Sequence, residues 1–183
     1  MKESEKAKAP EHPGQPQEHE CKCVCLPLCV CPPTSTSTST PPETCTFHIY
    51  LARVRVVRTS GDDPLGENEY TITGTANGVT VVHPSPTTWI QILKNQGWRT
   101  INRFITSVTL TKGSTKYVTC QASIIEWDKI ANSSEIGESD MADMQLMCDQ
   151  LIAPVRVNVE LHHLTNIPTI MGEAEVEFRA YQI

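Results

Sequence analysis

The sequence is poor in aromatic residues and in basic charge. It holds three Phe, four Tyr and three Trp among 183 residues, and its 15 Lys/Arg and 21 Asp/Glu give a net charge of −6. Residues 46–183 alone hold eleven Lys/Arg and fifteen Asp/Glu. Nucleic-acid binding needs dense cationic side chains that displace phosphate counterions, and often aromatic rings on which bases stack. We therefore expect no nucleic-acid partner.

The sequence also lacks the short motifs of common catalytic sites. It contains no Gly-rich phosphate loop, no His-Glu-x-x-His helix and no Gly-x-Ser-x-Gly turn. The six His are scattered, and the adjacent His162 and His163 would point to opposite faces of a strand. Because no nucleophile–base pair stands out, we expect a protein that is not an enzyme.

Long hydrophobic runs are missing as well. No window approaches the roughly 18–20 apolar residues of a membrane-spanning helix. Residues 1–10 are not followed by the apolar stretch of a secretory signal. We expect a chain made in the cytosol, and an extracellular or particle-associated assembly stays open as its final site.

Cysteine, by contrast, is concentrated in one segment. Five of the eight Cys fall within eleven residues, and a sixth follows a Pro/Ser/Thr tract. Residues 1–45 also hold eight of the thirteen Pro, a composition typical of an extended or disordered arm. We interpret residues 1–45 as an arm and linker, and residues 46–183 as one domain. The cysteines of the arm are Cys21, Cys23, Cys25, Cys29, Cys31 and Cys45.

Three chemistries are open to these cysteines. Alternate residues of an extended segment share one face, so the cysteines can form disulfides with neighbouring copies or with Cys45. Their apolar neighbours, such as Leu26 and Leu28, are typical of acylated clusters in peripheral membrane proteins. Cys-x-Cys pairs can also bind Zn²⁺ or Cu(I), although the usual Cys-x-x-Cys spacing is missing. We favour cross-linking of chains, ahead of acylation and metal binding.

The pattern of residues 46–183 predicts an all-β domain. Alternating, β-branched segments predict strands, and Asn77-Gly78 predicts a hairpin. A stripe formed by Met141, Met144, Met147 and Leu151 predicts a helix over residues 139–151. Residues 88–102 fit a short helix or an irregular segment. We predict an antiparallel β-sandwich of seven or eight strands with one short helix in a connection.

Two acidic loops follow predicted strands, at residues 61–70 and 125–140. Ca²⁺ takes six to eight oxygen ligands, and two such loops at one end of a sandwich can supply them together. The alternative is that these are solvated loop carboxylates. The candidate calcium ligands are Asp62, Asp63, Glu67, Asp128 and Glu135.

The same loops carry a resemblance to a known family. Glu69-Tyr70, Trp127-Asp128 and Glu135-Ile136-Gly137 resemble elements of the C2 domain family of calcium- and lipid-binding β-sandwiches. The resemblance implies a β-sandwich with a calcium site in its loops. Ile130 stands where the family has a second Asp, which implies a weakened site.

These patterns together favour a non-enzymatic binding or structural module. We expect it to assemble into a multi-copy particle or filament, with the cysteine-rich arm fastening neighbouring chains. Its partners would then be further copies or other structural proteins. The alternative is a peripheral membrane adaptor with an acylated arm and a lipid-binding, C2-like domain.

Overall fold

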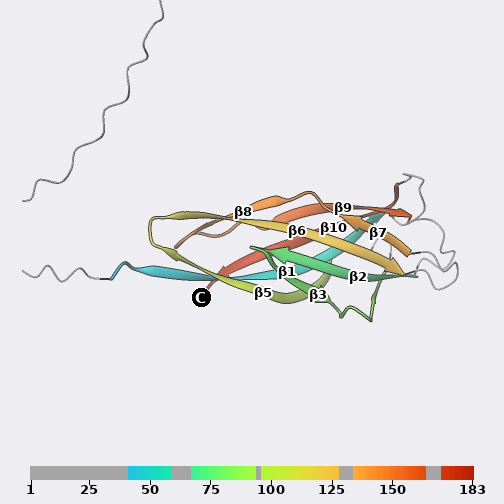
Figure 1. Ribbon diagram of the computed structural model, residues 1–183, viewed down its shortest axis with the longest axis horizontal. Coiled ribbons are helices and arrows are strands. Elements are labelled where there is room, and N and C mark those ends of the chain that lie inside the picture. The colour runs from blue at the N-terminus through green and yellow to red at the C-terminus, as the bar shows by residue number, and fades with distance from the viewer. Residues whose placement is uncertain (1–40, 59–66, 94–95, 128–133, 164–169) are drawn as a thin grey trace, which may run out of the picture. The chain divides into compact units, whose positions relative to one another are not determined.

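A computed structural model describes residues 41–58, 67–93, 96–127, 134–163 and 170–183 (Figure 1). The described residues are built from strands, and none of them forms a helix long enough to cross a membrane. The strands are β1 (Thr44–Arg58), β2 (Glu67–Ala76), β3 (Val79–His83), β4 (Ile90–Leu93), β5 (Arg99–Thr111), β6 (Thr115–Trp127), β7 (Ser134–Glu138), β8 (Ala142–Met147), β9 (Val155–His163) and β10 (Ile170–Gln182).

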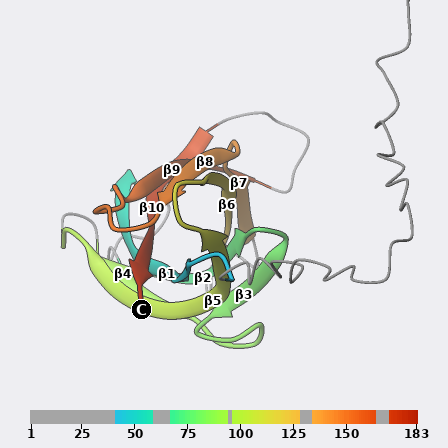
Figure 2. The same cartoon turned by 90° about the vertical axis from the view of Figure 1, so that its left-hand side faces the viewer.

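The strands form one antiparallel sheet in the order β3-β2-β6-β7-β9-β10-β1-β5, with β4 paired to β2 and β8 to β6. Viewed along the strands, the sheet folds back on itself into two layers (Figure 2). A Cβ added to Gly74 on β2 would lie 3.0 Å from Leu51 of β1 and 3.3 Å from Phe178 of β10. The two halves of the sheet therefore pack face to face, as in a sandwich.

Alternation of apolar and polar residues explains the layers. In β1, Phe47 and Ile49 are buried while His48 and Tyr50 are partly exposed, as a period of two requires. The hairpin between β2 and β3 turns at Asn77 and Gly78, whose φ angles are 51° and 76°. Two positive φ angles are typical of the two-residue turn that Asn-Gly predicts.

The all-β prediction is confirmed, but the predicted helix and strand number are wrong. Ten strands are described, and residues 142–147 form β8 in place of a helix. Met144 and Leu146 are buried, whereas Met141 is 69% and Leu151 100% exposed. Pairing with β6 therefore selects the period of two, and the helical stripe is not the buried face. Residues 90–93, in the segment read as a helix or irregular, form β4.

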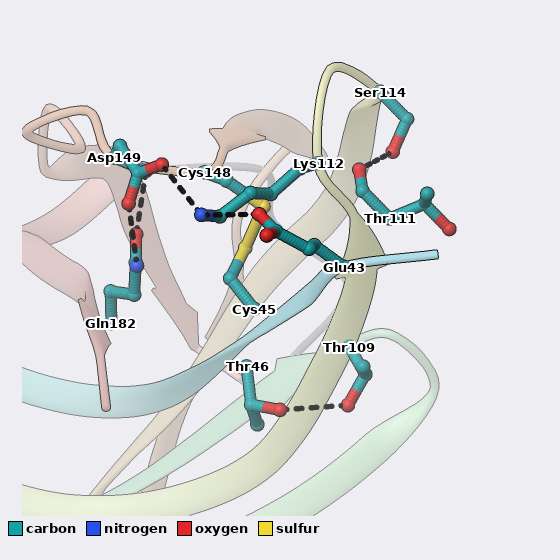
Figure 3. Close-up of a disulfide and its surroundings, with 10 residues drawn as sticks. All are labelled: Glu43, Cys45, Thr46, Thr109, Thr111, Lys112, Ser114, Cys148, Asp149 and Gln182. Atoms are coloured by element: carbon teal, nitrogen blue, oxygen red, sulfur yellow. Dashed lines mark hydrogen bonds and ion pairs between the residues drawn. A yellow bond between two sulfur atoms is a disulfide. The ribbon is translucent and has the colours of Figure 1, made fainter. Parts of the chain in front are cut away.

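Cys45 lies in β1, inside the body and not beyond it. It forms a disulfide with Cys148, 103 residues away in the sequence, just after β8 (Figure 3). The predicted option that Cys45 forms a disulfide with a cysteine of residues 21–31 is therefore wrong. The arm cysteines Cys21, Cys23, Cys25, Cys29 and Cys31 lie outside the described residues.

Candidate functional site

The predicted calcium ligands are only partly described. Asp62, Asp63 and Asp128 lie outside the described residues, and the side chain of Glu67 does too. Glu135 lies in β7 and is 3% exposed. In the part of the chain that the structure describes, no three His, Cys, Asp or Glu side chains are grouped to hold a metal ion. The calcium site stays a prediction.

Glu135 belongs to a row of buried polar side chains at this end of the sandwich. It pairs in register with Glu126 of β6, which pairs with Tyr70 of β2. Cross-strand partners share a face, and Tyr70 is 1% exposed, so both carboxylates lie on the interior side of the sheet. Burial raises the pKa of Tyr70 well above its usual range, and the charges of Glu126 and Glu135 add to this.

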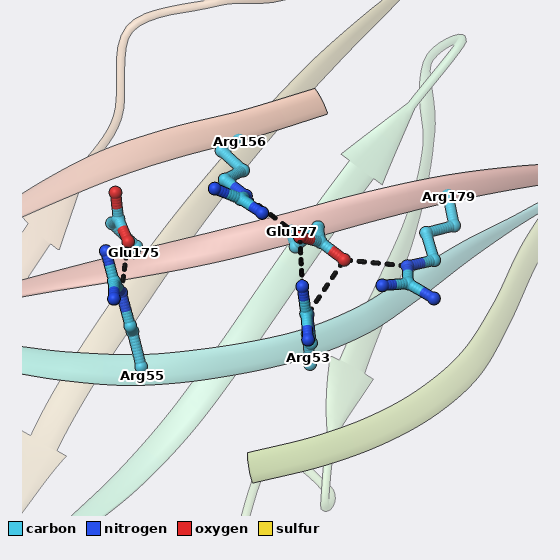
Figure 4. A network of polar contacts seen from close by, with 6 residues as sticks. All are labelled: Arg53, Arg55, Arg156, Glu175, Glu177 and Arg179. Carbon is cyan, nitrogen blue, oxygen red and sulfur yellow. Dashed lines mark hydrogen bonds and ion pairs between the residues drawn. The ribbon is translucent and has the colours of Figure 1, made fainter. Parts of the chain in front are cut away.

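A second polar group lies on the outer face of β9, β10 and β1, around Glu177 (Figure 4). The Glu177 side chain is fully buried and accepts hydrogen bonds with both oxygens. Arg53 donates from Nε and Nη2 at 2.8 Å each, Arg156 from Nε at 2.9 Å, and Arg179 from Nε at 2.7 Å. Beside this group, Arg55 pairs with Glu175.

Electrostatics keep Glu177 ionised. Burial alone would raise the pKa of Glu177, but the hydrogen bonds from Arg53, Arg156 and Arg179 outweigh it and lower the pKa to about 2. The register of the strands explains the arrangement, because Glu177 pairs with Arg53 on one side and with Arg156 on the other. Each arginine is held through Nε, which orients its guanidinium group.

Trp98, just before β5, covers part of this group. The centre of its ring lies 4.4 Å from the guanidinium carbon of Arg53, 4.9 Å from that of Arg55 and 5.3 Å from that of Arg156. Cations at these distances are attracted by the ring face. The ring therefore helps to fix three guanidinium groups that remain partly open to solvent, with side-chain exposures of 26%, 41% and 49%.

Aromatic side chains extend the same face along β1, β5 and β10. Phe104 is 44% and Tyr181 48% exposed. Tyr50 lies between them, with ring centres 5.7 Å from Phe104 and 5.8 Å from Tyr181, and His48 lies 5.2 Å from Phe104. Tyr50 pairs in register with Arg179, so the aromatic and arginine groups adjoin.

We call this surface the arginine–aromatic face. It consists of His48, Tyr50, Arg53, Arg55, Trp98, Phe104, Arg156, Glu175, Glu177, Arg179 and Tyr181. Four arginines and two glutamates give it a surplus of two positive charges. Guanidinium groups bind carboxylate and phosphate groups through paired hydrogen bonds, and aromatic rings contribute apolar contact area. The arrangement is suited to binding an acidic surface.

Sequence reasoning found part of this face. Arg53 and Arg55 alternate with Val54 and Val56, so strand geometry alone places these arginines on the face opposite to the buried valines, as the structure shows. Sequence reasoning did not identify Arg156, Arg179 or Glu177, which lie in β9 and β10. Strand β1 is far from β9 and β10 in the sequence, so alternation alone does not show that the three strands are neighbours.

No family model and no curated protein matches this chain. Solved structures of low similarity include a C2 domain of a plant extended synaptotagmin 1, with 12% identity and a TM-score of 0.29 over 79% of this chain and 98% of that one. Another, described as the structure of a C2 domain, has 9% identity and a TM-score of 0.30 over 75% and 97%. Human GIVD cytosolic phospholipase A2 has 13% identity and a TM-score of 0.31 over 79% and 17%. Two of the three are described as C2 domains, the family of the resemblance, and we draw no function from scores this low.

Proposed function

We propose that this protein is a non-enzymatic binding module that assembles with further copies of itself. The observation that supports this most is the arginine–aromatic face. Trp, Tyr and Arg are the residues that most often dominate the binding energy of protein interfaces. Here they share one exposed sheet surface, and their guanidinium groups are already oriented by Glu177 and Trp98. Such preorganisation lowers the entropy cost of binding.

The charge distribution supports a second copy as the partner. The face carries a surplus of two positive charges, whereas residues 46–183 as a whole carry eleven Lys/Arg and fifteen Asp/Glu. The remainder of this region therefore holds seven Lys/Arg and thirteen Asp/Glu. A cationic face on an otherwise acidic body is complementary to another part of the same body. Contacts between two different patches extend into rings or filaments.

The test is self-association measured by sedimentation velocity, with free thiols blocked by N-ethylmaleimide so that new disulfides do not contribute. We expect association at 0.05 M NaCl that weakens at 0.5 M, because salt screens contacts between exposed charges. Replacing Phe104→Ser together with Arg156→Gln should weaken association at least tenfold. Val79→Ser is the matched control, since Val79 is 41% and Phe104 44% exposed.

Two results would overturn assembly through this face. A monomer at all concentrations and salt levels would do so, as would equal association of the Phe104→Ser/Arg156→Gln variant and the Val79→Ser control. The membrane alternative has its own readout, which is co-sedimentation with phosphatidylserine vesicles. Vesicle binding by a monomer that is lost with Phe104→Ser would replace self-assembly with a membrane adaptor, because Arg and exposed aromatic rings also suit an anionic lipid interface.

A further inference from the structure

A groove lies on the outer face of the sheet beside β8. Its volume is about 300 Å³, and it is bounded by β8 and by residues 150–155, where β9 begins. The alternate residues Asp143, Gln145 and Met147 line it, and they point away from the core of the sandwich. The groove is therefore a hollow in the outer surface, between elements that already adjoin.

Exposed apolar side chains gather at this groove. Leu151 lines it, Met141 immediately precedes β8, and Tyr117 of β6 pairs in register with Gln145. Cross-strand partners share a face, so Tyr117 stands beside the groove. With the C-terminal Ile183, these three are the most exposed large hydrophobic side chains that the structure describes. Such a concentration marks a surface that contacts another molecule.

The chain around the groove is acidic. Residues 134–155 hold five Asp/Glu and no Lys, Arg or His. Glu138, Asp140 and Asp143 are exposed, and among the residues that the structure describes no ion pair engages them. Asp143 accepts a hydrogen bond of 2.9 Å from the hydroxyl of Thr119, which fixes the direction of its carboxylate. We call this surface the acidic groove, and it consists of Tyr117, Asp140, Met141, Asp143, Met147 and Leu151.

The arginine–aromatic face has the complementary chemistry. Its four arginines and two glutamates leave a surplus of two positive charges, and Phe104 and Tyr181 expose aromatic rings beside them. Guanidinium groups pair with carboxylates through directed hydrogen bonds, and aromatic rings pack favourably against methionine side chains. The face lies on β1, β5, β9 and β10, and the groove on β6 and β8. Because both are outer surfaces on different strands of one domain, they meet only when two copies associate.

We propose that the arginine–aromatic face of one copy docks on the acidic groove of the next. The aromatic side chains of the face then cover Met141 and Leu151, and its arginines pair with Asp140 and Asp143. This inference rests on the proposed assembly and names the surface that receives the face. The contact joins two different patches, so each copy keeps one free groove or one free face, and the assembly grows head to tail.

The test is complementation between two full-length variants in sedimentation velocity, with free thiols blocked by N-ethylmaleimide. The face variant carries Phe104→Ser and Arg156→Gln. The groove variant carries Asp143→Asn and Leu151→Ser. Asn keeps an oxygen that accepts the hydrogen bond from Thr119, and Leu151 is fully exposed, so the groove variant should keep the fold.

The matched control carries Glu160→Gln and Val79→Ser, which also neutralise one exposed carboxylate and shorten one exposed aliphatic side chain. We expect the face variant and the groove variant each to associate about tenfold more weakly than the parent, and the control to associate like the parent. Where the parent associates and both variants are monomeric, their equimolar mixture should form a dimer that grows no further. The groove variant supplies the intact face of that dimer, and the face variant supplies the intact groove.

Three results would count against the inference. Parent-like association of the groove variant would overturn it and leave assembly through the arginine–aromatic face intact. A mixture that stays monomeric at a concentration where the parent associates would also overturn it, because an intact face and an intact groove would then fail to bind. A parent protein that is monomeric at all concentrations would reject the proposed assembly itself, and this contact with it.

Discussion

Replacing Glu177→Gln should destabilise the protein in a way that depends on pH. Gln has nearly the same volume but no charge, so Arg53, Arg156 and Arg179 would lose their common partner. A fall of the pKa of Glu177 from its ordinary 4.5 to about 2 corresponds to about 3 kcal/mol of native-state stabilisation. Removal of one partner from a buried ion pair costs a similar ~3–5 kcal/mol.

The sign follows from linkage. A carboxylate whose pKa is lower in the native state contributes stability above its unfolded pKa of 4.5 and loses it as the pH falls toward 2. The free energy of unfolding of the parent protein should therefore exceed that of Glu177→Gln by about 3 kcal/mol at pH 7. The difference should shrink through pH 4 and approach zero near pH 2.

Urea unfolding followed by circular dichroism between pH 2 and pH 7 measures this difference. Glu160→Gln is the control, because Glu160 is exposed on β9 and its replacement should change stability by less than ~0.5 kcal/mol. A Glu177→Gln deficit that is constant over the whole pH range would refute the reasoning. It would show that the loss comes from packing and not from the ionised carboxylate.

Three further predictions concern other parts of the molecule. Gly137→Ala should lower stability by about 3 kcal/mol or more in urea unfolding, because the added Cβ would collide with the Glu160 carbonyl oxygen; stability equal to the parent would contradict the packing. Cys148→Ser should cost about 4 kcal/mol, since the disulfide closes a 103-residue separation, and dithiothreitol should then leave the variant's melting temperature unchanged. If the acidic loops bind calcium, millimolar CaCl₂ should raise the melting temperature and EDTA reverse it; a flat response removes the calcium site.

Local sequence patterns predicted where individual strands lie better than they predicted which strands pair with one another. The period of two in β1 and the Asn77-Gly78 turn depend on residues that are adjacent in the chain, so both could be predicted. The segment after residue 139 has two overlapping periods. Met141, Met144 and Leu151 fit a helix, whereas Met144 and Leu146 fit a strand. Hydrogen bonding to β6 selects the strand, and that contact is not local.

The candidate site depended still more on distant contacts. Arg53 and Glu177 are 124 residues apart, and Arg156 reaches the same carboxylate from a third strand. The register of β1, β10 and β9 places Glu177 beside Arg53 and Arg156. The spacing of these residues in the sequence does not determine that register. The disulfide between Cys45 and Cys148 escaped prediction for the same reason.

The free-energy cost of burying Glu177 among Arg53, Arg156 and Arg179 indicates what these residues are for. Taking charged groups out of water is costly, and replacing a buried ion pair by apolar residues of similar volume is often neutral or stabilising. Glu177 could therefore be an apolar residue, as Val176 and Phe178 beside it are, with Arg53 and Arg156 replaced to match. Stability alone does not explain why an otherwise acidic body gathers three arginines around one buried carboxylate. Arg53, Arg156 and Arg179 are held through Nε, and Trp98 lies against the first two. Their guanidinium groups keep other N–H donors for a partner, and a binding role accounts for a cost that folding does not require.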